Sequence, residues 1–213
     1  MALKCLVFDC DGVLLDSVPV KTRAFIRLAL PYGQEAADRF EMFHSMHGGV
    51  SRYLKFEWFF KECLGREITP EEKADWSRRF GEYALDEVRK CPMIPGALET
   101  LQAWHGRLPL YVCTGAPQAE VMAILSERGL GHYFKAIYGS PPAKARLLET
   151  IVKEDAKVEP DEAVMIGDAS TDLHAAEENE TLFYGVGPDL KGGNYPWSEN
   201  LIPLNSWIEA HVR

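Results

Sequence analysis

The chain has 213 residues, of which 46% are hydrophobic, so it can bury a sizeable core as one domain with an insertion or as two modest domains. Its formal net charge of -9, without a run of Lys and Arg, argues against nucleic acid as a partner. The five cysteines are scattered and form no C-x-x-C pair, so we expect reduced thiols rather than a disulfide framework or a zinc site. No export signal and no apolar run of the roughly 18 residues that span a bilayer are visible, so we expect a cytoplasmic protein with no membrane partner.

Short apolar runs bounded by turn residues predict buried parallel strands over 3–8, 108–113, 134–138, 163–166 and 182–186. Between them, helical spacing of apolar residues predicts helices over 96–104, 118–128 and 143–153. This alternation predicts an α/β fold with a doubly wound parallel sheet and a site beyond the carboxyl ends of its strands.

The stretch from Ser17 to Cys91 breaks this rhythm, because it holds no convincing strand and is punctuated by glycines. It predicts a helical insertion over 17–91 in a core formed by 1–16 and 92–213. Within it, Thr69 is typical of a helix N-cap and Pro70 of the first helical position.

Two carboxylates follow the first predicted strand. Asp9 and Asp11 can share one site, because alternate residues of an extended segment point the same way, and Gly12 lets the chain turn. An ordinary polar turn is the alternative interpretation of the same pattern.

Two more carboxylates follow the strand predicted over 163–166. Asp168 and Asp172 are four residues apart and can share a face if a helix has begun, with helix capping as the alternative. Clustered with Asp9 and Asp11, these acids would repel one another unless a cation were present. Oxygen ligands of this kind suit Mg²⁺, which we expect as the cofactor.

Groups suited to a phosphate follow two further strands. Thr114 offers a hydroxyl and Gly115 an unobstructed backbone N–H. Lys144 could bring a positive charge to the same edge, with a solvated surface lysine as the alternative.

These four sites, in this order and each after a core strand, resemble the four motifs of the haloacid dehalogenase superfamily. The resemblance covers essentially the whole chain, including residues 9–17, Pro95-Gly96 and Gly167-Asp168 with Asp172. It is most similar to the phosphoglycolate phosphatase type, whose helical cap lies between the first motif and the second core strand. It therefore implies a Rossmann-like core with residues 17–91 as the cap.

The resemblance also implies roles for the residues. Asp9 would be the nucleophile that forms an aspartyl-phosphate, and Asp11 would protonate the leaving oxygen and later activate water. Mg²⁺ would be held by the Asp9 carboxylate, the Asp11 backbone carbonyl and Asp168, with Asp172 in support. Thr114, Gly115 and Lys144 would neutralise the transferring oxygens.

The function that this implies is that of a phosphoric monoester hydrolase acting on a small phosphorylated metabolite, either phosphoglycolate or a sugar phosphate. The presence of Asp11 argues against dehalogenation, which needs no acid to protonate a halide. The segment after Thr114-Gly115 lacks the Ser, Asn and Lys often found in the family, which leaves the contacts of that loop open.

In the cap, the segment around Gly49 and Arg52 is the best candidate for a substrate contact, because an arginine could bind a carboxylate or a second phosphate. A solvated helix-surface arginine is the alternative. His44 and His47 are interpreted as packing or surface residues rather than metal ligands, and the aromatic residues over 53–60 as packing inside the cap.

Three rival functions stay open. A phosphomutase of the same family would use the same aspartates, and a silent binding protein on this scaffold would be expected to lack a key carboxylate. A receiver domain would carry its phosphorylated Asp after a central strand, without a large helical insertion. The oligomeric state is not indicated.

Overall fold

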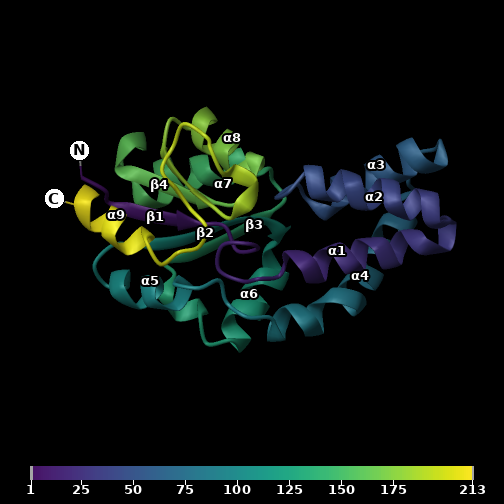
Figure 1. Ribbon diagram of the computed structural model, residues 1–213, viewed down its shortest axis with the longest axis horizontal. Helices are drawn as coiled ribbons and strands as arrows, with labels where there is room; N and C mark the ends of the chain where they lie inside the picture. The colour runs from purple at the N-terminus through teal and green to yellow at the C-terminus, as the bar shows by residue number, and fades with distance from the viewer. Residues whose placement is uncertain (1, 213) are drawn as a thin grey trace.

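A six-stranded sheet lies at the centre of the protein, with the strand order β3-β2-β1-β4-β5-β6 and parallel pairing throughout (Figure 1). The computed structural model describes residues 2–212. The strands are β1 (Cys5–Phe8), β2 (Leu110–Pro117), β3 (Ala136–Ser140), β4 (Ala163–Gly167), β5 (Leu182–Val186) and β6 (Trp197–Ser198). The chain builds outward from β1 to β3 and then from β4 to β6 in the other direction. The strand order therefore switches between β1 and β4, the position at which doubly wound sheets bind their ligands.

Helices connect these strands and form the insertion. The α-helices are α1 (Val18–Ala29), α2 (Gln34–Met46), α3 (Arg52–Leu64), α4 (Pro70–Lys90), α5 (Ala97–Trp104), α6 (Gln118–Glu127), α7 (Lys144–Glu149), α8 (Ser170–Glu178) and α9 (Leu204–His211). Short 3₁₀ turns occur at η1 (Leu30–Tyr32), η2 (Gly131–Tyr133), η4 (Pro160–Glu162) and η5 (Pro188–Leu190), and a π-helical segment, η3 (Thr150–Ala156), continues α7.

Both faces of the sheet are covered, which explains why its strands are continuous apolar runs. Leu6 and Phe8 belong to one apolar cluster with residues of α5, α6 and α9, whereas Cys5 and Val7 belong to another with residues of α7 and α8. Alternate residues of a strand point to opposite faces, so β1 contributes to both layers. In Figure 1, α5 and α6 lie on one side of the sheet and α7 and α8 on the other. The predicted doubly wound sheet is confirmed.

The predicted helical insertion is present as α1 to α4, which lie together beside the carboxyl end of the sheet (Figure 1). The segments that enter and leave it are hydrogen-bonded to each other: the Asp16 N–H donates to the Pro92 carbonyl at 2.9 Å, and the Ile94 N–H donates to the Leu14 carbonyl at 3.1 Å. The boundaries of the predicted domains, at 16/17 and 91/92, stay a prediction.

The interior of the insertion is aromatic. The largest side chains buried there come from three of its helices and contact one another edge to face or at a tilt: Phe40, Phe56, Phe59, Phe60, Trp76 and Phe80. The interpretation of residues 53–60 as packing is therefore correct for these phenylalanines. Thr69 caps α4 as predicted, because its hydroxyl accepts the Glu72 N–H at 3.2 Å while the Glu72 carboxylate accepts the Thr69 N–H at 3.0 Å.

Some elements differ from the prediction. The strand predicted over 108–113 starts later and runs on to Pro117, with a shift of register between Thr114 and Pro117. The helix predicted over 143–153 becomes π-helical from Thr150. Neither β6 nor α9 was predicted from the sequence. A two-residue edge strand carries no periodicity from which it could be read. No helix among residues 2–212 is both long enough and apolar enough to span a membrane.

Gly96, the residue before α5, provides a test of the close approach between the start of α5 and the chain at Ile202. Its φ is +87°, and a Cβ there would lie 2.4 Å from the Ile202 backbone nitrogen, whereas Gly106 has a φ of +79° with nothing within 4 Å. We expect Gly106→Ala to lower the free energy of unfolding by about 1–2 kcal/mol, the cost of the left-handed backbone. Gly96→Ala should lower it by at least about 1 kcal/mol more, because the chain at Ile202 must also shift. Urea unfolding measures both, and equal losses would contradict this account.

Candidate active site

Asp9 lies directly after β1 and is 2% exposed. Its Oδ1 accepts the Cys10 N–H at 2.6 Å, and its Oδ2 accepts a hydrogen bond from Lys144 Nζ at 2.9 Å. The carboxylate is thus fixed at the switch point of the sheet with one oxygen bound to the main chain and the other to a cation.

Lys144 is the first residue of α7 and is 7% exposed, so its interpretation as a surface lysine is wrong. Its ammonium donates to Asp9 Oδ2 at 2.9 Å and to Asp172 Oδ1 at 2.6 Å. Burial alone would lower the pKa of Lys144, but Asp172 and Asp9 outweigh it and raise this pKa well above its ordinary value. Lys144 is therefore a permanent buried cation.

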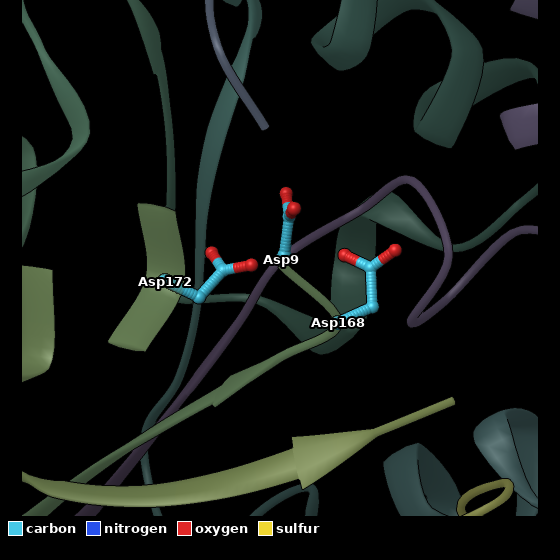
Figure 2. Close-up of side chains that lie close together, drawn as sticks. All are labelled: Asp9, Asp168 and Asp172. Atoms are coloured by element: carbon cyan, nitrogen blue, oxygen red, sulfur yellow. The ribbon is translucent and has the colours of Figure 1, made fainter. Parts of the chain in front are cut away.

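Asp168 and Asp172 come from the end of β4 and the start of α8, and Figure 2 shows their carboxyl groups beside that of Asp9. Ligand atoms of the three residues lie within 4.8 Å of one another. Burial, followed by the charges of Asp9 and Asp172, raises the pKa of Asp168 well above its usual range. Burial also raises the pKa of Asp172 to about 7, although Lys144 acts in the opposite direction.

The three carboxylates could hold a divalent cation. Asp172 has both oxygens occupied, because Oδ1 accepts from Lys144 and Oδ2 accepts the Ala169 N–H at 3.1 Å. No hydrogen bond or ion pair within residues 2–212 engages the Asp168 carboxylate. When all three acids are ionised, the carboxylates beside one ammonium leave two negative charges in the site, which a hard divalent ion would neutralise. The capping alternative for Asp172 is also partly correct, since it binds the Ala169 N–H at the start of α8.

Gly12 shapes this site. Its φ is +79°, and a Cβ there would lie 2.0 Å from Asp168 Oδ2. The turn after Asp11 can therefore pass next to the Asp168 carboxylate only because residue 12 has no side chain.

Asp11 does not join the three-carboxylate group. Its carboxylate accepts from Ser17 Oγ and from Lys21 Nζ, each at 2.5 Å. Burial would raise the pKa of Asp11, but Lys21 and Ser17 outweigh burial and hold this pKa below its ordinary value. Asp11 is therefore ionised and turned toward α1 of the insertion.

Thr114 and Gly115 lie inside the end of β2, which corrects the prediction that they follow the strand. The Thr114 side chain is buried, and its Oγ1 accepts the Ala116 N–H at 3.3 Å. A Cβ on Gly115 would lie 2.0 Å from the Gly49 carbonyl oxygen. The two glycines therefore bring the backbones of the core and the insertion together.

Side chains also connect the insertion and the core. Thr171 donates to the Gly48 carbonyl at 3.0 Å. Arg52 is 5% exposed, and its guanidinium donates to the Glu120 carboxylate at 2.5 Å and lies 4.3 Å from the centre of the Phe80 ring. The interpretation of Arg52 as a solvated surface arginine is wrong, and its side chain links α3 to α6.

A cavity of about 200 Å³ lies between the core and the insertion. The predicted residues that line it are Asp9, Asp11, Gly49, Arg52, Thr114, Gly115 and Asp168. Two of its lining cations, Lys21 and Lys55, were missed by the sequence analysis. Helical spacing could have found both, because Lys21 lies one turn after Ser17 and Lys55 lies three residues after Arg52.

Residues 3–179 match the model of the haloacid dehalogenase-like hydrolase family, and the chain therefore belongs to this family. Phosphoglycolate phosphatase 1 of Pseudomonas aeruginosa is 30% identical over 182 residues, which are 82% of this chain and 65% of that relative. A fructose-1-phosphate phosphatase of Escherichia coli is 26% identical over 182 residues, 80% of this chain and 89% of that protein.

A similar fold is found in the crystal structure of a β-phosphoglucomutase from Clostridium difficile. Its TM-score is 0.81 at 19% identity, with 99% of this chain and 97% of that chain covered. At this level of identity the likeness concerns the fold alone.

Glu120 provides a test of the link between insertion and core. We expect Glu120→Gln to lower the free energy of unfolding by about 2 kcal/mol, because Arg52 would stay buried without a counter-charge. Glu87→Gln is the control, since Glu87 pairs with Arg23 on the surface of the insertion, where both side chains are more than half exposed. Urea unfolding of both variants makes the comparison. A similar, small loss in both would contradict the role given to the Arg52–Glu120 pair.

Proposed function

We propose that this protein is a Mg²⁺-dependent phosphomonoesterase that transfers the phosphoryl group of a small phosphorylated metabolite to Asp9. The observation that carries the proposal is the buried Asp9 carboxylate, which faces the cavity with Lys144 on one side and the unengaged Asp168 carboxylate on the other. A nucleophile, a fixed cation and a place for a metal ion are the parts that phosphoryl transfer needs.

The proposed reaction has two steps. An Asp9 oxygen attacks phosphorus, the bond from phosphorus to the ester oxygen breaks, and that oxygen takes a proton from Asp11. Water then attacks the aspartyl-phosphate and gives its proton to Asp11, which releases phosphate and restores Asp9. Because Lys21 and Ser17 favour the ionised form of Asp11, the first step requires this carboxyl group to leave Lys21 and to take up a proton from solvent when the substrate binds.

The transferring oxygens would be bound by groups that the fold has already placed. Thr114 offers its hydroxyl hydrogen, Gly115 its backbone N–H and Lys144 its ammonium. These groups cost no reorganisation during the reaction, which is the basis of electrostatic catalysis.

Mg²⁺ would be held by the carboxylates of Asp9 and Asp168 and by the backbone carbonyl of Asp11. When bound, it would neutralise charge on the phosphoryl oxygens. Asp172 would act indirectly, because its contacts with Lys144 and the Ala169 N–H orient the lysine toward Asp9.

The substrate class follows from the relatives and the cavity. Phosphoglycolate and fructose 1-phosphate are named for two relatives, and both are small phosphate monoesters. We propose that this chain acts on one of this class, in the cytoplasm and without nucleic acid or membrane partners. A phosphomutase is the second candidate, favoured by the similar fold of a β-phosphoglucomutase. Isomerised sugar phosphate in place of free phosphate would identify that activity.

Phosphate release from phosphoglycolate, sugar phosphates and nucleotides, with Mg²⁺ or with EDTA, tests the proposal. We expect Asp9→Asn to reduce turnover of the best substrate by about 10³-fold or more, because the amide is not a nucleophile while its volume is almost the same. Asp38→Asn is the control, since Asp38 is exposed on α2 and lies outside the cavity. Near-normal turnover by folded Asp9→Asn protein would falsify the mechanism.

The pH dependence of stability tests the metal site. In the metal-free protein the raised pKa of Asp172, about 7 against an ordinary 3.8, means that the folded state keeps a proton which the unfolded state has lost. The contribution of this group to stability is therefore fully present below pH 3.8 and is lost as the pH rises through about 7, and the raised pKa of Asp168 acts in the same direction. Because metal ligands must be deprotonated, we expect Mg²⁺ to raise the melting temperature more above this window than inside it.

Melting temperatures at pH values of about 5 and about 8, with Mg²⁺ or EDTA, make this measurement. Asp168→Asn should remove the stabilisation by Mg²⁺. A stabilisation that is independent of pH, or that survives in Asp168→Asn, would place the metal elsewhere.

A further inference from the structure

Lys55 lies in α3, lines the cavity and is 2% exposed. Its ammonium donates to His44 Nδ1 at 2.7 Å and has a longer contact, of 3.5 Å, with the His44 carbonyl oxygen. The face of the Phe25 ring lies 5.3 Å from Nζ. An ammonium has three N–H donors, so this arrangement leaves at least one of them for a ligand in the cavity.

The position of the Lys55 ammonium is fixed by a chain of hydrogen bonds through three helices. Burial, followed by the charges of Lys55 and Lys21, lowers the pKa of His44 to about 3, so its ring is neutral. Its Nδ1 accepts from Lys55, which places its hydrogen on Nε2, 3.0 Å from Thr22 Oγ1. The Thr22 hydroxyl in turn donates to the Val18 carbonyl at 2.9 Å. His44 is thus a neutral acceptor that orients Lys55, in agreement with its interpretation as a packing residue.

Lys55 differs from the other cations of the cavity wall in having no counter-charge. Lys21 pairs with Asp11 and Arg52 pairs with Glu120, each at 2.5 Å. No carboxylate within residues 2–212 forms an ion pair with Lys55. Burial, followed by the charge of Lys21, lowers the pKa of Lys55 to about 7. A buried cation is destabilising unless an anion accompanies it, and the cavity is the place from which that anion can come.

We propose that Lys55 binds a second anionic group of the substrate, so that the substrate is a small phosphate monoester carrying a carboxylate or a second phosphate. This inference rests on the proposed function, which places the ester phosphate at Asp9. A second anion on the same small molecule would lie in the same cavity, on the side formed by the insertion.

The remaining wall of the cavity supports an anion rather than a polyhydroxylated group. The insertion contributes four apolar side chains to it, those of Val18, Phe25, Val50 and Phe80, and only two hydroxyl groups, those of Thr22 and Ser45. The Thr22 hydroxyl already donates to the Val18 carbonyl, so few partners are left for several substrate hydroxyl groups. Its volume of about 200 Å³ is also below the roughly 300 Å³ at which pockets for drug-sized ligands begin. Of the two anions, a carboxylate is the more compact.

Three phosphate esters that share a two-carbon skeleton test the inference: phosphoglycolate, ethylene glycol bisphosphate and hydroxyethyl phosphate. The first two carry a second anion, and the third carries a neutral hydroxyl in its place. We expect wild-type protein with Mg²⁺ to show a kcat/KM at least about 10-fold higher for one or both anionic esters than for hydroxyethyl phosphate. Preference between the two anionic esters identifies the carboxylate or the phosphate as the group that Lys55 recognises.

Lys55→Met and Lys55→Gln should each lower kcat/KM for the preferred anionic ester at least about 10-fold, and for hydroxyethyl phosphate less than about 3-fold. Lys61→Met is the control, because Lys61 is exposed on the same helix and outside the cavity. Melting temperatures verify that each variant is folded.

The outcomes separate this inference from the proposed function. Release of phosphate from all three esters without preference, or equal losses on charged and neutral esters in folded Lys55 variants, would overturn the role of Lys55 while leaving the phosphatase intact. No phosphate release from these esters or from any member of the wider panel would contradict the proposed function itself.

Discussion

The ion pairs of Lys144 with Asp9 and Asp172 hold the site together. They join the end of β1 and the start of α8 to the first residue of α7, three elements that are separate in the chain. The two carboxylates offset the cost of removing the Lys144 ammonium from water. The same lysine does not neutralise the acids around it, since three carboxylates remain beside one positive charge. The site is therefore stable enough to form and still attracts a cation.

This constraint explains why the fold places its chemistry where it does. The strand order switches between β1 and β4, so the chain segments after these strands diverge and leave room for side chains between them. The turn after Asp11 lies in this space, where Gly12 packs directly against the Asp168 carboxylate. The insertion then covers the opening through backbone contacts at Gly48 and Gly49, which meet Thr171 and the end of β2. Side chains at these glycines would keep the two parts of the molecule apart.

Most of the fold could be predicted from the sequence because its signals are local. Each core strand is an apolar run bounded by turn residues, and Asp9, Asp11 and Asp168 follow such runs directly. Burial of polar side chains could not be predicted in this way. Lys144 and Arg52 are buried by partners 135 and 68 residues away, so nothing in their immediate surroundings distinguishes them from surface residues. For Lys55, helical spacing from Arg52 could have indicated the shared helix face, but not its burial, because its environment is built by side chains from α1 and α2.

The side chains that the core and the insertion contribute to the cavity carry opposite charges. The core side carries the carboxylates of Asp9, Asp11, Asp168 and Asp189, and the insertion side carries the cations Lys21, Arg52 and Lys55. Two of the three cations are already matched, one with the carboxylate proposed as the acid and one with a carboxylate of the core. Loss of either pair would leave an unpaired buried charge. Lys21 is therefore needed to hold Asp11, and Arg52 is needed to hold the insertion against α6. The electrostatic preference of the cavity is therefore set by the charged lining residues without a protein partner. Among residues 2–212 these are the carboxylates of Asp168 and of the exposed Asp189 on the core side and the Lys55 ammonium on the insertion side, and they favour a metal ion at the first and an anion at the second.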